Sequence, residues 1–258
     1  GGRREGDCFV IDWADDVWTL DQTDGRFGLR SAGSTWVHLA LAGLTATGRR
    51  DVGAFQPSAL VGVEIVHSRL VATFEPSGWH GLTVRAAWGV CRNGAGMDLE
   101  VQASASSVGE LRRLEVLVET IPGEVAWSLD RPLIVRPRDR SAAGASYDGR
   151  ESTATLGTLT TGPIHSQGTP FDPVRLFPLD RGSFLSMGHP QDVARWMHSE
   201  GPAGIAIRYA LFGLDLEKGV VLRGRLREVC FPNGTEWDER TADEHRLFLT
   251  EPPPLRTE

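Results

Sequence analysis

Between residues 60 and 104, apolar and polar side chains alternate along four successive stretches. In residues 82–88, for example, apolar side chains occupy every second position. Successive side chains of an extended strand point to opposite faces of a sheet, so a period of two predicts half-buried strands rather than a helix. Turn-forming residues such as those at 75–78 separate the stretches. The pattern therefore predicts a four-stranded antiparallel meander, with strands at residues 61–66, 70–74, 82–88 and 97–104.

Similar patterns predict further strands on both sides of the meander. These strands lie at residues 8–13, 17–20, 36–44, 111–120, 133–135, 153–160, 205–211, 220–227 and 246–250. The best candidate for a helix is residues 189–198. Pro190 stands where the first turn of a helix tolerates proline, and Gly201-Pro202 would stop the segment.

Many strands and scarcely any helix predict an all-β fold, a two-layer antiparallel sandwich with long loops and at most one or two short helices. We expect the meander and residues 205–227 to form its two halves. Residues 131–168 are rich in Pro, Arg, Ser, Thr and Gly. They contain no flexible low-complexity tract, which indicates long loops rather than an interdomain linker. Residues 1–258 are thus expected to form a single domain.

The charge balance excludes several classes of partner. The chain has 27 Lys and Arg against 34 Asp and Glu, a formal net charge of −7. Nucleic acids and anionic membranes are held mainly by clustered basic side chains, which this balance disfavours. No apolar run approaches the roughly 20 residues that span a bilayer. We expect a soluble chain with no nucleic-acid and no membrane partner.

The three cysteines, Cys8, Cys91 and Cys230, are an odd number at long separations. This arrangement fits neither a disulfide framework nor the short paired spacings of a zinc site. Free cysteine is commonly buried, so we predict inert buried thiols. Their presence favours a reducing, cytoplasmic compartment.

Arginines are the most regular feature of the last predicted strand pair. Arg208 lies on the first strand, and Arg223, Arg225 and Arg227 share one face of the second. On a concave sheet they could bind an acidic sugar or sugar phosphate, because guanidinium groups match carboxylate and phosphate oxygens. The alternative is cross-strand pairing with carboxylates of neighbouring strands, namely Asp98, Glu100, Glu115 or Glu119. Arg208, Arg223 and Arg225 are therefore candidate substrate-binding residues.

Tryptophan suits carbohydrate binding, because its flat face packs on the C–H face of a pyranose while the indole N–H remains able to donate. Trp79 lies in a predicted loop, Trp196 in the predicted helix and Trp237 in a polar segment. Trp36 and Trp88 instead belong to apolar alternation. Trp79 and Trp196 are candidate sugar-binding residues, with core or rim packing as the alternative. They favour carbohydrate over lipid or nucleotide.

The later, irregular part of the chain contains three histidines and three aspartates: His165, His189, His198, Asp172, Asp180 and Asp192. Their spacing matches neither His-x-His nor His-Glu-x-x-His, so we expect no metal and no cofactor. The histidines are left as loop hydrogen-bonding groups or as acid–base catalysts. Nucleophile-elbow, Walker and dinucleotide motifs do not occur in the sequence.

Residues 69–84, 97–104 and 205–227 resemble galactose-mutarotase-like domains in the rhythm of their strands. The resemblance covers about the central and C-terminal two thirds of the chain. It implies a β-supersandwich, a fold of aldose epimerases and of accessory domains in glycoside hydrolases and polysaccharide lyases. Mutarotases of this fold use a His acid and a Glu base across the sugar ring. His165 or His189 would then be the acid, and Glu217 the base.

Two functional hypotheses follow from these patterns. The first is a carbohydrate-binding protein that is an aldose epimerase or a related sugar-active isomerase. The second is a non-catalytic carbohydrate-binding or assembly domain of the same fold. A histidine and a carboxylate that face each other at sugar-spanning distance would distinguish the first from the second.

Overall fold

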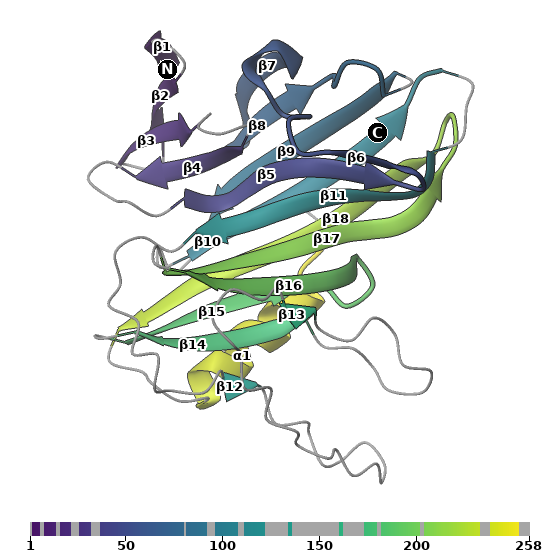
Figure 1. The fold of residues 1–258 in the computed structure, drawn as a ribbon. Helices are drawn as coiled ribbons and strands as arrows, with labels where there is room; N and C mark the ends of the chain where they lie inside the picture. Colours follow the sequence, from purple (N-terminus) through teal and green to yellow (C-terminus); the bar gives the residue numbers. More distant parts are fainter. Residues whose placement is uncertain are drawn as a thin grey trace, which may run out of the picture.

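The chain forms two antiparallel β-sheets packed face to face, with one α-helix on the outer side of one sheet (Figure 1). The computed structural model describes residues 2–5, 8–13, 16–21, 26–31, 37–79, 81–91, 96–107, 111–121, 134–135, 160–161, 173–179, 182–201, 204–232 and 238–252. Within these residues the architecture is all-β and confirms the predicted two-layer sandwich.

The ten-stranded sheet, here called sheet A, runs in the order β1-β2-β3-β4-β5-β11-β17-β16-β13, with β6 also paired to β5. Its strands are β1 (Gly2–Glu5), β2 (Cys8–Trp13), β3 (Asp16–Asp21), β4 (Phe27–Ser31), β5 (Val37–Ala46), β6 (Arg49–Asp51), β11 (Leu111–Ile121), β13 (Thr160–Thr161), β16 (Val193–Gly201) and β17 (Gly204–Leu216).

The eight-stranded sheet, here called sheet B, runs in the order β12-β14-β15-β18-β10-β9-β8-β7. Its strands are β7 (Leu60–Val66), β8 (Arg69–Phe74), β9 (Leu82–Val90), β10 (Gly96–Ala105), β12 (Ile134–Val135), β14 (Val174–Leu179), β15 (Gly182–Gly188) and β18 (Val221–Pro232). The predicted meander is confirmed as β7 to β10, the strands at one edge of this sheet. A short 3-10 helix, η2 (Pro57–Ala59), leads into it.

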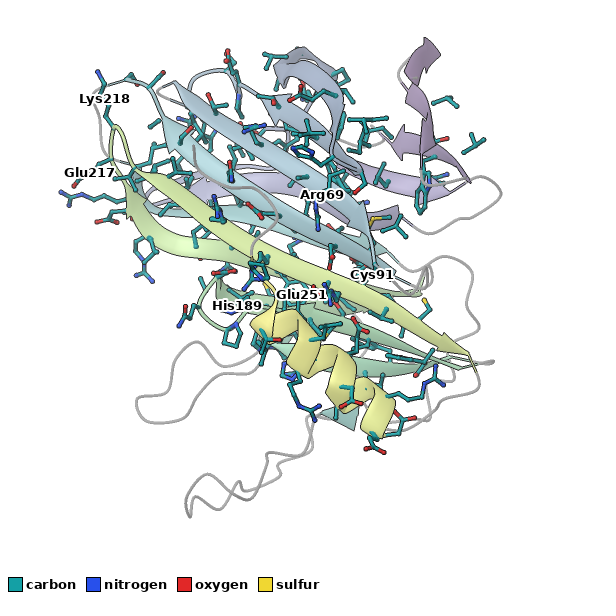
Figure 2. All side chains as sticks on the ribbon, turned by 180° about the vertical axis from the view of Figure 1, so that it is seen from behind. Arg69, Cys91, His189, Glu217, Lys218 and Glu251 are labelled. Atoms are coloured by element: carbon teal, nitrogen blue, oxygen red, sulfur yellow. The ribbon has the colours of Figure 1, made fainter. Side chains whose placement is uncertain are left out.

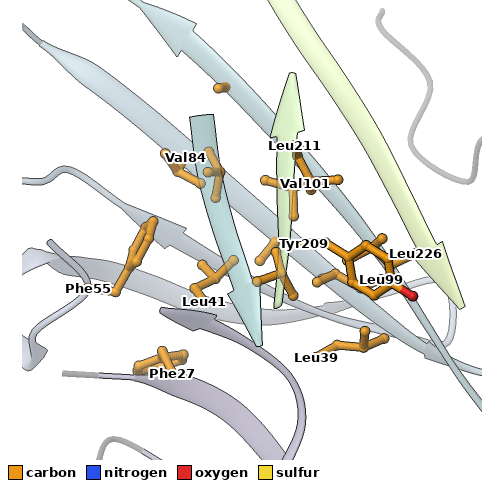
Figure 3. Packing of buried hydrophobic residues seen from close by; sticks show 14 of the residues in the cluster. Phe27, Leu39, Leu41, Phe55, Val84, Leu99, Val101, Tyr209, Leu211 and Leu226 are labelled. Atoms are coloured by element: carbon orange, nitrogen blue, oxygen red, sulfur yellow. The ribbon is translucent and has the colours of Figure 1, made fainter. Parts of the chain in front are cut away.

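The core lies between the two sheets and follows the period of two (Figure 3). Leu99 and Val101 of β10 meet Tyr209 and Leu211 of β17 in one cluster of buried side chains. Burial of this apolar surface is the main favourable contribution to folding. The intervening positions of each strand point out of the sandwich, and this alternation places Asp98 and Glu100 of β10 and Arg223, Arg225 and Arg227 of β18 on the outer face of sheet B. Glu228 of β18 and Arg175 of β14 point inward, where they contact Thr120 and Trp196 of sheet A.

The expectation that residues 60–104 and 205–227 form opposite halves of the sandwich is correct for β17 and wrong for β18. β18 pairs with β10 of the meander over nine residue pairs, from Gly96↔Val229 to Ser104↔Val221. β17 instead pairs with β11 and β16 in sheet A. The turn between β17 and β18 therefore leads the chain from one sheet to the other.

The predicted helix at residues 189–198 is wrong, because residues 193–201 form β16. This strand pairs antiparallel with β17 and places Trp196 opposite Tyr209. Pro190 stands in the turn before the strand. Hydrogen bonding to β17 and burial of Trp196 in the core outweigh the local helical signals, which contain no information about a neighbouring strand.

The predicted strand at residues 246–250 is also wrong, because helix α1 occupies Glu239–Thr250. Its start is a capping box: the Asp238 carboxylate accepts from the backbone N–H of Thr241, and the Thr241 hydroxyl accepts from the backbone N–H of Asp238. Thr241, His245 and Phe248 are buried at spacings of four and three, which is the period of one helix face. α1 covers part of the outer face of sheet B.

Candidate functional site

Charged side chains from the neighbouring strands β10 and β18 lie side by side on the outer face of sheet B. β10 turns Asp98, Glu100 and Gln102 outward, and β18 turns outward the three arginines that stand opposite them. The register pairs Asp98 with Arg227, Glu100 with Arg225, and Gln102 with Arg223. Facing positions on adjacent antiparallel strands lie close enough for their side chains to interact.

Ion pairs satisfy much of this charge. Arg227 Nε lies 2.5 Å from Asp98 Oδ1, and Arg223 Nε lies 3.1 Å from Glu100 Oε1. On the outer face of sheet A, Arg208 Nη2 lies 2.6 Å from Glu119 Oε2. The cross-strand alternative is thus confirmed for three predicted carboxylates. The fourth, Glu115, pairs with Arg195, whose Nη2 lies 2.5 Å from Oε2.

Arg69 of β8 reaches the same row by crossing the neighbouring strand β9 at a glycine. A Cβ on Gly89 would lie 2.6 Å from Arg69 Nη1, so the guanidinium occupies the space that a side chain there would need. Arg69 Nη2 comes within 3.6 Å of Asp98 Oδ2 on β10. Nη1 is buried and has no hydrogen-bond partner among the described residues.

Helix α1 closes the lower part of this face (Figure 2). Glu244, in the middle of the helix, and Glu251, its C-cap, both contact Arg227, whose side chain is 5 % exposed. Burial disfavours the charged guanidinium, but the hydrogen bonds and charges of Asp98 and Glu251 raise the pKa of Arg227 above its usual value. Phe248 packs onto a second apolar cluster beneath the helix.

A small hollow of about 30 Å³ lies between the sheet and the end of α1, and we call it the outer-face hollow. Its charged lining consists of Arg69, Asp98, Glu100, Arg225, Arg227 and Glu251. Phe248 contributes apolar surface. The hollow therefore presents guanidinium donors, carboxylate acceptors and an apolar wall within one small volume.

His189 and Asp192 stand next to the outer-face hollow and are joined to it by Arg225. The backbone N–H of His189 donates to the Arg225 carbonyl at 3.1 Å, and the Arg225 N–H donates to Asp192 Oδ2 at 3.0 Å. His189 Nδ1 lies 3.8 Å from Asp192 Oδ1. The Arg225 guanidinium donates to the Glu251 carbonyl at 2.7 Å. His189, Asp192 and Arg225 thus form one cluster at the end of α1.

The environment of this cluster shifts the pKa values of Asp192 and His189. Burial raises the pKa of Asp192 to about 6, against the opposing effect of Arg225. Burial and the positive charge of Arg225 lower the pKa of His189. At neutral pH, His189 is therefore uncharged and Asp192 is mostly ionised.

The two candidate tryptophans lie in the core, where their rings cannot receive a sugar. Trp79 is fully buried, its Nε1 donates to Asp51 Oδ2 at 3.0 Å, and Arg49 stacks 3.9 Å from the ring centroid. Trp196 is 6 % exposed, with Arg175 stacked 3.9 Å from its centroid. The alternative of core packing is confirmed for both tryptophans. The sequence could not decide this, because it does not show which other segments cover these residues in the fold.

Glu217 does not join His189. It lies exposed at the turn between β17 and β18, and Figure 2 shows it apart from His189, which stands beside the end of α1. The four residue steps from Val221 to Arg225 alone span about 13 Å of strand. The predicted pair of His189 and Glu217 is therefore not assembled across a pyranose. His165, Trp237 and the side chain of His198 lie outside the described residues.

Residues that the sequence analysis missed are Arg69, Gly89 and Glu251. The sequence contained one signal of this contact, because a glycine inside a strand marks a bulge or a close approach of another group. Gly89 is such a glycine, within the alternating stretch of β9. The contribution of Arg69 depends on which strand lies beside β9, and the sequence pattern does not state that.

The prediction of buried, unpaired thiols is confirmed for Cys91, and for Cys230 it is confirmed only in that the thiol is free. Cys91 is buried, Cys230 is half-buried, and both are free. Burial and the Glu228 charge raise the pKa of Cys230 to about 12, and burial raises the pKa of Cys91 as well. A thiol protonated at neutral pH is a poor nucleophile.

In the described part of the chain, no group of three or more His, Cys, Asp or Glu residues could hold a metal ion. A search of the same residues finds no helix with the length and apolar character needed to cross a membrane.

No known protein family and no curated protein matches this sequence. Among solved structures, the chain is similar to an alpha-N-acetylgalactosaminidase from Bifidobacterium bifidum, in a complex with GalNAc, at a TM-score of 0.50 and 12 % identity. That match covers 96 % of this chain and 38 % of the enzyme. It shows a shared fold.

Two further structures give lower scores. The galactosidase domain of an alpha-galactosidase–sucrose kinase matches with a TM-score of 0.47 and 9 % identity, over 91 % of this chain and 42 % of that chain. A GH36 alpha-galactosidase from Geobacillus stearothermophilus, in complex with 1-deoxygalactonojirimycin, matches with a TM-score of 0.43 and 10 % identity, over 88 % of this chain and 41 % of that chain. The chain thus spans about two fifths of the length of these enzymes.

Proposed function

We propose that this chain is a carbohydrate-binding β-supersandwich module without catalytic activity of its own. The observation that carries the proposal is the outer-face hollow, which Arg69, Arg225 and Arg227 line together with the carboxylates of Asp98, Glu100 and Glu251. A sugar hydroxyl can accept from a guanidinium and donate to a carboxylate at once. This combination is what the lining of the hollow offers.

The fold likeness supports a carbohydrate-related role. The Bifidobacterium bifidum enzyme shares the fold of nearly the whole chain, yet the matched part is 38 % of that enzyme. Its structure contains GalNAc, which makes galactose-type sugars the first ligands to test. A fold alone does not determine a function, so the likeness only adds to the argument from the hollow.

Two features favour binding over catalysis. Mutarotation needs an acid and a base on opposite sides of one sugar ring, whereas Glu217 stands in the turn before β18 and His189 lies beside Arg225 in the middle of that strand. A volume of about 30 Å³ is also far below the roughly 300 Å³ at which enclosed small-molecule sites begin. The outer-face hollow suits one substituent of a sugar that rests on the surface.

A second candidate, an aldose 1-epimerase-like isomerase, is favoured by one observation. Asp192, with a pKa raised to about 6, stands 3.8 Å from the Nδ1 of His189, and perturbed titrating groups cluster at catalytic sites. In that case His189 and Asp192 would exchange protons with the sugar, in place of His189 and Glu217.

Two measurements test the proposal. Isothermal titration with galactose, GalNAc and glucose should show saturable binding, which weakens when Arg69 is replaced by Met. Polarimetry with α-galactose and α-glucose should show no acceleration of mutarotation over buffer. Absence of binding to every sugar would refute the module. Acceleration that disappears in Asp192→Asn would establish the isomerase instead.

A further inference from the structure

We infer that the outer-face hollow receives the uncharged hydroxymethyl group of a hexose, and that it rejects sugars carrying a carboxylate or a phosphate at that position. The inference rests on the proposed carbohydrate binding and specifies its ligand. It differs from the acidic sugar that the arginine row favours at first sight.

The size of the hollow limits what can enter. The hollow has a volume of about 30 Å³, and a cavity of about 10–15 Å³ already holds one water, so a group of a few non-hydrogen atoms fits into it. A hydroxymethyl group consists of one carbon and one oxygen and meets this limit. A pyranose ring does not, and it would remain outside on the face of the sheet.

The charge of the surroundings argues against an anion. Four guanidinium groups belong to the cluster around the hollow: Arg69, Arg223, Arg225 and Arg227. Five carboxylates pair with them: Asp98, Glu100, Asp192, Glu244 and Glu251. Among the described residues, these ion pairs therefore contain one more carboxylate than guanidinium groups. An incoming carboxylate would lose its hydration next to Asp98, Glu100 and Glu251, and each of the four arginines of these pairs already contacts a carboxylate.

The hydrogen-bonding groups complement a neutral hydroxyl. Arg69, Arg225 and Arg227 bring guanidinium donors to the lining, and the Asp98 and Glu100 carboxylates that line the same hollow are acceptors. One hydroxyl both accepts and donates, so it can serve both kinds of group. The carbon of the hydroxymethyl group would contact Phe248, which also lines the hollow.

The position of Arg69 depends on Gly89, and this provides a specific test. Any side chain at residue 89 would overlap the guanidinium, with a Cβ 2.6 Å from Nη1 and 2.8 Å from Cζ. Because the overlap involves the flexible end of an arginine, Gly89→Ala should fold while moving Arg69 out of place. Gly62→Ala in β7 of the same sheet is the matched control, since no heavy atom lies within 4 Å of its added Cβ.

The experiment compares three sugars in each of two configurations by titration calorimetry or saturation-transfer NMR. The galactose series is galactose, L-arabinose and galacturonic acid, and the glucose series is glucose, xylose and glucuronic acid. In at least one series, the hexose should bind about tenfold more tightly than the pentose without the hydroxymethyl group and the uronic acid with a carboxylate. Gly89→Ala and Arg69→Met should each remove this preference, and Gly62→Ala should keep it.

Any other outcome of these binding measurements would contradict one part of the inference. A uronic acid that binds as tightly as its hexose would overturn the rejection of anions, and an equally tight pentose would overturn the hydroxymethyl assignment. In both cases the proposed carbohydrate binding would stand. A preference that persists in both Gly89→Ala and Arg69→Met would refute the role of Arg69. If no sugar of either series binds, the proposed function itself is wrong.

Discussion

At the scale of single residues, Arg227 is an enclosed charge on which the outer face of sheet B depends. It contacts Asp98, Glu244 and Glu251, and its side chain is 5 % exposed. The three carboxylates come from β10, from the middle of α1 and from its C-cap. One arginine thus joins the sheet to the helix.

Replacing Arg227 with Met should destabilise the protein by about 3–5 kcal/mol, because three partly buried carboxylates would lose their shared counter-charge. Urea unfolding measures the loss. The control is Arg246→Met, which removes an ion pair to Asp243 that is mostly exposed and should change stability by less than about 1 kcal/mol. Equal effects of the two variants would contradict this role of Arg227.

Asp192 should make stability fall as pH rises from about 4 to 6. The folded protein retains this proton until about pH 6, whereas the unfolded chain releases it near pH 4. The stabilising contribution is therefore complete below about pH 4 and is lost as pH passes 6. Asp192→Asn does not titrate, so its stability relative to the original protein should increase over this range by up to about 3 kcal/mol.

Urea unfolding of both proteins at pH 4 and pH 7 provides the comparison. Other carboxylates titrate in both proteins and cancel in the difference. A difference that is the same at the two pH values would show that Asp192 has an ordinary pKa.

At the scale of elements, α1 is joined to sheet B by a mixed contact. Phe248 is 3 % exposed and packs with Val174, Leu185 and Met187, while the charges around Arg227 lie beside it. Leu247, the preceding residue, is 43 % exposed. Leu249 is partly buried against the same cluster, so the apolar part of the helix contact consists of Phe248, which is buried, and Leu249.

Phe248→Ala should lower the free energy of unfolding by about 3 kcal/mol, because the truncation leaves an apolar cavity under the helix. Amide hydrogen exchange within residues 241–250 should accelerate, since the helix would separate from the sheet more often. Leu247→Ala, at the exposed neighbouring position, should cost less than about 1 kcal/mol. If the two variants exchange and unfold alike, α1 is held by other contacts.

At the scale of the whole molecule, one core joins both sheets. Its largest cluster includes Phe74 and Trp88 of sheet B together with Leu41 and Tyr209 of sheet A. The chain crosses between the sheets directly after β17, so neither sheet is formed by one continuous part of the sequence. Separate unfolding of either sheet would expose the common core.

We therefore expect residues 1–258 to unfold in a single cooperative transition, as the prediction of one domain requires. Scanning calorimetry should give a calorimetric enthalpy equal to the van't Hoff enthalpy. Two resolved transitions, or a calorimetric enthalpy well above the van't Hoff value, would instead divide the chain into independent units.

The sequence by itself determined which faces the strands bury and which residues carry charge. The period of two in residues 82–88 and 97–104 is a property of the extended backbone, so it predicts an inward Leu99 and an outward Glu100 without knowledge of neighbours. It also predicted the all-β class, and it offered pairing of the arginines with Asp98, Glu100, Glu115 or Glu119 as the alternative to a sugar-binding row, since unlike charges on adjacent strands attract.

Only the tertiary structure decided which strands are adjacent. The alternation in β18 is the same whether it pairs with β10 or with β17, and residues 193–201 acquire strand structure from the partner β17. The outer-face hollow depends on this adjacency, because Arg69, Gly89, Asp98 and Arg227 come from four strands in a row and Glu251 from the end of a helix. Side-chain period is a local property, whereas a binding site requires the neighbours that folding supplies.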